Sequence, residues 1–253
     1  MHGALFSVLV ALIVSVGGTG GGTLVTCLVK RTGDRLSAAL MGVSAGIMAS
    51  MVFLDMVPES LEMSVSSALL GIALGAAIML LFIRLVPHRD AGELDEQTVQ
   101  DYRQSGLKRS GMMIAVGIAI HNLPQGIAIG SGIVSGEAFG LHLAVLLLLH
   151  NIPEGMAMAI PLKLGGVRMG KILLLAVFAA LPTVIGAVLG SLAANISQGF
   201  VAGSIGFAAG AIAYLTLSEL LPQAMRFKKG MFTVWFIVLG LFLGVAVHMV
   251  AGH

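Results

Sequence analysis

Two nearly identical polar motifs interrupt long apolar stretches of the sequence, at residues 121–129 (HNLPQGIAI) and 150–158 (HNIPEGMAM). Each begins with His-Asn and continues to a Pro and a Gly, with Gln125 in the first copy where Glu154 stands in the second. Polar and ionisable groups are expensive at such depth in an apolar segment. A doubled cluster of them therefore predicts a functional site.

The spacing within each motif points to cation binding. His121 and Gln125 are four residues apart, as are His150 and Glu154, so each couple shares one face of a helix. Imidazole nitrogens with carboxylate and amide oxygens suit Zn²⁺, Fe²⁺, Mn²⁺ and similar divalent ions. The alternative is a purely structural role, in which these side chains only link helices by hydrogen bonds. The duplication and the carboxylate favour a cation site.

The elements that must position the two motifs are membrane helices. With 57% hydrophobic and 10% charged residues and a mean hydropathy of +1.01, the 253-residue chain is predicted to be an all-α polytopic membrane protein. The first apolar run lacks a basic leader, so we expect it to be a span and not a signal peptide. Eight runs are long enough to cross a bilayer, at residues 4–29, 36–57, 63–86, 112–134, 139–162, 172–194, 199–221 and 231–251.

The basic residues indicate topology. All 14 Lys and Arg fall in or beside the connections after the first, third, fifth and seventh runs. By the positive-inside rule these connections face the cytoplasm and both termini face outward. The pI of about 8.9 is thus a mark of topology and does not predict nucleic-acid binding. The one long connection, 87–110, is mixed in charge and is expected to be a flexible or partly helical cytoplasmic loop.

A second repeat relates the outer parts of the chain. Residues 45–58 and 209–222 share Ala-Gly, then an acid nine residues after the glycine, then Pro three residues further on. The acids are Asp55 and Glu219. Because the two runs cross in opposite directions, the repeat is predicted to be inverted, as in many secondary transporters, with spans 1–3 and 6–8 around central spans 4 and 5.

Together these motifs resemble the ZIP family of divalent metal transporters, in particular its bacterial zinc and iron uptake branch. The resemblance covers essentially the whole chain and implies one transmembrane domain, 1–253. It also implies inward movement of divalent metal as substrate, with no cofactor, by one helix bundle shifting against another. Metal would be bound between spans 4 and 5 at His121, Asn122, Gln125, His150, Asn151 and Glu154.

The chain departs from the family pattern at its centre. Gln125 stands where relatives usually have Glu, and Leu181 where they usually have the Glu of a Glu-Pro pair. With Glu154 as the remaining central carboxylate, we predict a single ion where fuller relatives hold two. Asp55 and Glu219 are predicted to be way-stations at the entrance and the exit.

Two other functions would also place polar groups inside a membrane protein. An intramembrane metallohydrolase is disfavoured because the chain lacks a His-Glu-X-X-His motif. A proton-coupled carrier or channel for another solute is the stronger alternative, since His and Glu can titrate. A homodimer is one alternative for the oligomeric state. A multi-pass plasma-membrane location is expected.

Overall fold

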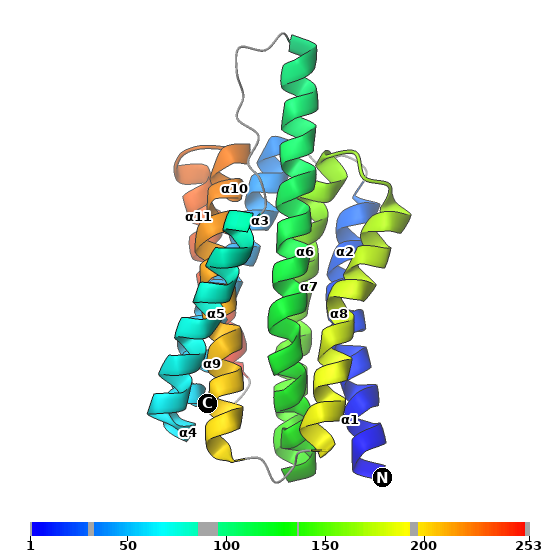
Figure 1. The fold of residues 1–253 in the computed structure, drawn as a ribbon. Helices are drawn as coiled ribbons and strands as arrows, with labels where there is room; N and C mark the ends of the chain where they lie inside the picture. Colours follow the sequence, from blue (N-terminus) through cyan, green and yellow to red (C-terminus); the bar gives the residue numbers. More distant parts are fainter. Residues whose placement is uncertain (1, 30–32, 86–95, 136, 193–196, 251–253) are drawn as a thin grey trace.

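The computed structural model describes residues 2–29, 33–85, 96–135, 137–192 and 197–250, and every regular element in them is helical (Figure 1). The elements are α1 (His2–Leu12), the π-helical segment η1 (Ile13–Gly17), α2 (Gly18–Leu28), α3 (Asp34–Met51), the π-helical segment η2 (Val52–Met56), α4 (Val57–Met63), α5 (Val65–Leu85), α6 (Glu96–Ser135), α7 (Glu137–Leu164), α8 (Met169–Leu192), α9 (Gln198–Leu215), the π-helical segment η3 (Thr216–Leu220), α10 (Leu221–Phe227) and α11 (Met231–Val250).

Seven helical segments among the described residues are long and apolar enough to cross a membrane. They are Ala4–Leu28, Asp34–Met63, Val65–Leu85, Gln104–Val134, Met169–Leu192, Gln198–Phe227 and Met231–Met249. These correspond to seven of the eight predicted runs, and the remaining run, 139–162, falls within the 28-residue helix α7. The all-helical, multi-pass membrane class is therefore confirmed.

Helix α6 is much longer than the run 112–134 that predicted it. Its 40 residues begin at Glu96, so it extends about 60 Å, roughly twice the thickness of a bilayer core. Its first turns occupy part of the connection 87–110 and project beyond the neighbouring helices (Figure 1). The expectation of a partly helical connection is confirmed for residues 96–110, while 87–95 lie outside the described residues.

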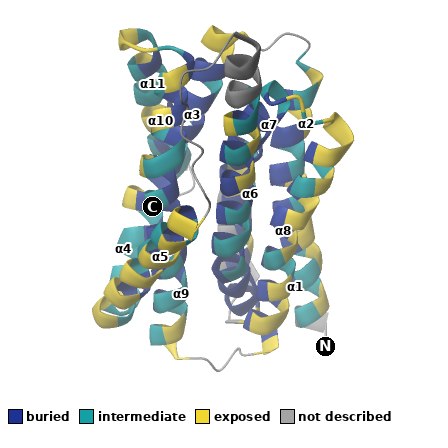
Figure 2. Ribbon diagram, turned by 45° about the horizontal axis from the view of Figure 1, so that its top comes forward, coloured by how far each residue is buried: buried dark blue, intermediate teal, exposed yellow. Residues whose placement is uncertain are grey.

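The helices pack as two groups, which we call the first and second bundles. The first bundle contains α1, η1, α2, α6, α7 and α8, and the second contains α3, η2, α4, α5, α9, η3, α10 and α11. They meet where α6 packs on α9 and α7 packs on α3. The yellow, exposed surfaces in Figure 2 lie on the outer helices, while α6 and α7 present mostly buried surface around the centre.

Glycines bring helix backbones into contact inside the first bundle. A Cβ on Gly126 of α6 would lie 2.0 Å from the carbonyl oxygen of Thr183 on α8. A Cβ on Gly155 of α7 would lie equally close, at 2.0 Å, to the carbonyl oxygen of Thr19 on α2. No side chain fits in either place. The backbone of α6 therefore packs directly against that of α8, and the backbone of α7 packs directly against that of α2.

The segments that carry the second sequence repeat have matching elements. Helix, π-helical segment and short helix measure 18, 5 and 7 residues in α3-η2-α4 and again 18, 5 and 7 residues in α9-η3-α10. In each copy a proline follows two residues after the π-helical segment, Pro58 and Pro222. Proline lacks an N–H and crowds the preceding turn, which favours local widening there.

Candidate metal centre

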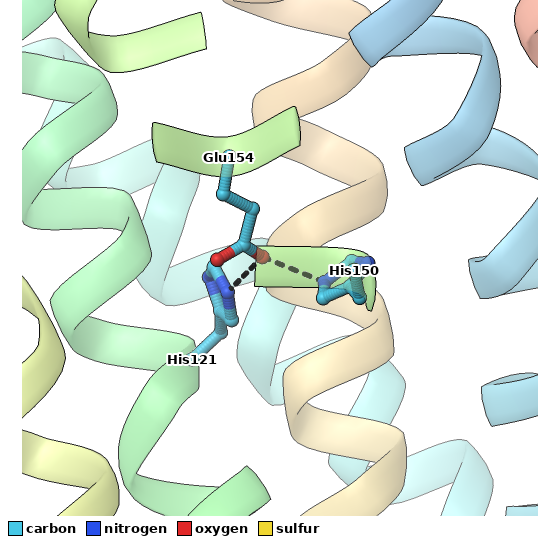
Figure 3. Close-up of side chains that lie close together, drawn as sticks. All are labelled: His121, His150 and Glu154. Atoms are coloured by element: carbon cyan, nitrogen blue, oxygen red, sulfur yellow. Dashed lines mark hydrogen bonds and ion pairs between the residues drawn. The ribbon is translucent and has the colours of Figure 1, made fainter. Parts of the chain in front are cut away.

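The two sequence motifs meet between α6 and α7, on the side of the first bundle that faces α3 of the second bundle. His121 comes from α6, while His150 and Glu154 lie one turn apart on α7. Figure 3 shows the carboxylate of Glu154 directed toward both imidazole rings. All three side chains are fully buried, at 0% exposure.

The distances make this a compact donor set. Oε1 of Glu154 lies 2.7 Å from Nε2 of His121 and 2.6 Å from Nε2 of His150. One donor atom from each residue falls within 4.8 Å of the other two. The rings stand edge to face, with centroids 6.3 Å apart. Two imidazoles and one carboxylate at this separation can close around a single transition-metal ion with small side-chain adjustments.

The outer nitrogen of each ring has its own partner. Nδ1 of His121 donates to the carbonyl oxygen of Gly117 at 2.9 Å, and Nδ1 of His150 donates to Sδ of Met51 at 3.1 Å. Carbonyl and thioether groups only accept hydrogen bonds, so the ring hydrogen of each neutral imidazole is on Nδ1. The lone pairs of both Nε2 atoms then point toward an oxygen of the Glu154 carboxylate, which also carries lone pairs. These atoms repel one another unless a cation lies between them, and that cation can be a proton or a metal ion.

Gln125 adds polar atoms that are not used internally. Its side chain is 3% exposed, and within the described part of the chain neither its Oε1 nor its Nε2 has a hydrogen-bond partner. The same holds for Oε2 of Glu154. Buried polar atoms without partners are destabilising unless a ligand or water satisfies them. One turn along α6 from His121, the Gln125 amide oxygen is suited to complete the donor set.

The two asparagines tie the site helices to the rest of the first bundle. Nδ2 of Asn122 donates to the carbonyl oxygen of Ala179 on α8 at 2.8 Å, and Nδ2 of Asn151 donates to that of Val14 in η1 at 3.2 Å. Their Oδ1 atoms have no hydrogen-bond partner among the described residues. Each asparagine therefore anchors a helix while keeping one oxygen available.

The two acids of the second repeat lie outside the central donor set. Asp55 forms an ion pair with Nδ1 of His248 on α11, and Oε2 of Glu219 accepts a hydrogen bond from Ser110 on α6 at 3.4 Å. Each acid is the fourth residue of a π-helical segment. Such segments often mark functional positions, because the widened turn redirects one side chain.

Met51 is a neighbour of the central donor set that the sequence did not single out. It lies on α3, in the second bundle, and is 3% exposed. A methionine inside an apolar run is indistinguishable from a core residue in the sequence alone.

Comparison with known proteins identifies the family of the chain. Residues 87–252 match the family model described as ZIP zinc transporter. The chain belongs to the ZIP family. It is 30% identical to the zinc transporter ZupT of Chlorobium luteolum over 239 residues, which are 88% of this chain and 90% of the relative. It is 29% identical to ZupT of Nitratidesulfovibrio vulgaris, over 90% of both chains.

Membership of the ZIP family confirms the resemblance inferred from the motifs. Members of this family are membrane transporters and not enzymes, so zinc is a substrate to be moved and not a cofactor. A shorter match, 35% identical over 137 residues to ZupT of Stenotrophomonas maltophilia, covers 53% of this chain.

Proposed function

We propose that this protein carries Zn²⁺ or a similar divalent transition metal across the plasma membrane toward the cytoplasm. The observation that supports this most is the fully buried convergence of His121, His150 and Glu154 within 4.8 Å. The relatives named above are called zinc transporters, which makes zinc the first substrate to test.

The central site binds one ion at a time. His121, His150 and Glu154 are its main ligands, with Gln125 as the fourth. Asn122 and Asn151 flank it through their free oxygens. One carboxylate leaves a divalent ion with a single net positive charge, and a second divalent ion beside it would be strongly repelled in a buried, weakly polar site.

The path across the membrane uses both repeats. We place α7 as the fifth of eight spans, with both termini outside and the connection 87–110 in the cytoplasm, in keeping with the distribution of basic residues. The equal element lengths of α3-η2-α4 and α9-η3-α10 support an inverted repeat. Asp55 and Glu219 then serve as stations on the outer and inner sides.

Movement of one bundle against the other alternates access to the site. The first bundle contains the donor set, and its helices pack closely against one another at glycines. One example is the contact of Gly126 with the backbone of Thr183. Such a unit can slide as a rigid body against the second bundle, in the manner of an elevator.

Uptake into liposomes tests the proposal. Purified protein is reconstituted and offered Zn²⁺, Cd²⁺, Fe²⁺ and Mn²⁺, beside the double variant His121→Ala/Glu154→Ala and the isosteric Glu154→Gln. We expect saturable uptake by the parent that both variants lose. Proton flux without metal, or equal uptake by the variants, would favour a carrier of another kind. Metal accumulation by intact cells expressing the protein tests the direction.

A further inference from the structure

The two histidines of the central site donate their Nδ1 hydrogens to acceptors in different bundles. Gly117, which receives the Nδ1 hydrogen of His121 at 2.9 Å, lies one turn back on the same helix, α6. Met51, which receives that of His150 at 3.1 Å, lies on α3 in the other bundle. One ring is therefore fixed by its own helix, and the other depends on a side chain across the boundary between the bundles.

The chemistry of the Met51 contact is directional. A thioether accepts weakly and never donates, so it selects the imidazole tautomer with hydrogen on Nδ1 and leaves Nε2 free. The same contact orients the His150 ring with Nε2 at 2.6 Å from the Glu154 carboxylate. Partners of this kind, which hold a metal-binding histidine by its other nitrogen, strongly affect metal affinity.

Met51 is well placed to do this reproducibly. It is 3% exposed, so water does not compete for the Nδ1 hydrogen. It lies directly before the π-helical segment η2, at the point where α3 meets α7.

We propose that Met51 is a positioning residue that sets the orientation of His150 from the opposite bundle, so that the metal affinity of the site depends on how the two bundles are placed. When the bundles shift, the hydrogen bond of His121 travels with α6, whereas that of His150 is broken. The site then keeps one fixed imidazole and loses the support of the other, which weakens binding in the shifted arrangement. This inference rests on the proposed metal site.

Three variants separate positioning from packing. Met51→Leu keeps an apolar side chain of similar size and removes the acceptor. Met51→Gln restores an acceptor of similar length. Met41→Leu, at another fully buried methionine of α3, is the matched control. The dissociation constant for Zn²⁺ is measured in detergent by competition with a chromophoric chelator, with Glu154→Gln alongside.

The order of affinities decides the matter. We expect Met51→Leu to bind Zn²⁺ about tenfold more weakly than the parent, the lower end of the range for such partners because a thioether is a weak acceptor. Met51→Gln should bind Zn²⁺ more tightly than Met51→Leu. Met41→Leu should bind Zn²⁺ with the affinity of the parent. A pure packing role gives the opposite order, with Leu tolerated and Gln disruptive, and would overturn the inference.

A spectroscopic measurement keeps the test decisive if Met51→Gln does not fold. In protein with ¹⁵N-labelled histidine and no metal, Nδ1 of His150 should carry its hydrogen in the parent, whereas in Met51→Leu this hydrogen should pass in part to Nε2, which faces Glu154. Identical spectra would also overturn the inference. If instead the parent binds no Zn²⁺, or Glu154→Gln binds as well as the parent, the proposed metal site itself fails.

Discussion

Adding one methyl group at Gly155 should disable the metal site without touching a ligand. The Cβ of Gly155→Ala would lie 2.0 Å from the carbonyl oxygen of Thr19 and 3.0 Å from the amide nitrogen of Thr23, whereas ordinary contacts begin near 3.4 Å. The carbonyl of Gly155 also accepts a hydrogen bond from Thr23 at 3.2 Å. Helices α7 and α2 must therefore separate by about 1 Å or more, at a cost of about 1–3 kcal/mol.

That displacement is large compared with what metal coordination tolerates. Ligand distances hold to within about 0.2 Å, and His121 is on α6, a different helix from the α7 that carries His150 and Glu154. Zinc in small structural sites binds with about 10–16 kcal/mol over four ligands, or about 3 kcal/mol for each. Loss of one ligand thus predicts affinity lower by on the order of a hundredfold.

The assay is Zn²⁺ affinity by chelator competition, with thermal unfolding followed by circular dichroism. Gly21→Ala is the matched control, because a Cβ on Gly21 of α2 meets nothing within 4 Å and alanine is the better helix former. We expect Gly155→Ala to bind weakly and melt early, and Gly21→Ala to match or exceed the parent in stability. Parent-like affinity in Gly155→Ala would refute the view that backbone contact sets the ligand geometry.

Three further changes test other contacts. Asn151→Ala removes the bond to the Val14 carbonyl and should lower stability by about 0.6–1.7 kcal/mol, as for other hydrogen bonds between membrane helices, while weakening Zn²⁺ binding less than Glu154→Gln does. Lys163→Met leaves the carbonyls of Thr26, in the last turn of α2, and of Val29, directly after α2, without their donor, and hydrogen–deuterium exchange should rise at that end of α2 only. Gln125→Glu adds a second central carboxylate and should raise the zinc bound per chain from one ion to two, as measured by elemental analysis. Gln125→Ala adds no charge and should still bind one ion. One bound ion in Gln125→Glu as well would contradict the argument that charge limits the number of ions.

The convergence of His121, His150 and Glu154 was predictable because it follows from spacing. Four-residue separation places His150 and Glu154 on one helix face, and the repeated motif pairs them with His121 on the adjacent helix. The partners of the asparagines were not predictable, because an amide donor can reach any carbonyl that packing brings near, and Asn122 reaches Ala179. Met51 was missed for the same reason, since only tertiary packing distinguishes it from other apolar residues.

The secondary structure shows a similar division. Apolar length located the spans, but the mixed charges before residue 112 do not distinguish a loop from the helical extension that α6 makes. The π-helical segments η2 and η3 were also not predicted. A hydrophobic pattern changes too little over one widened turn to reveal it, although Pro58 and Pro222 follow both segments.

The two widened turns also affect how this chain can change in length. A π turn holds one residue more than an α turn needs, so deleting one residue within η2 or η3 would close the turn into ordinary helix. The helices on either side would keep their rotational phase, whereas the same deletion elsewhere in α3 or α9 would rotate everything beyond it by about 100°. At each of these two places a membrane helix of this protein could lose a residue during evolution and still present the same faces to its neighbours.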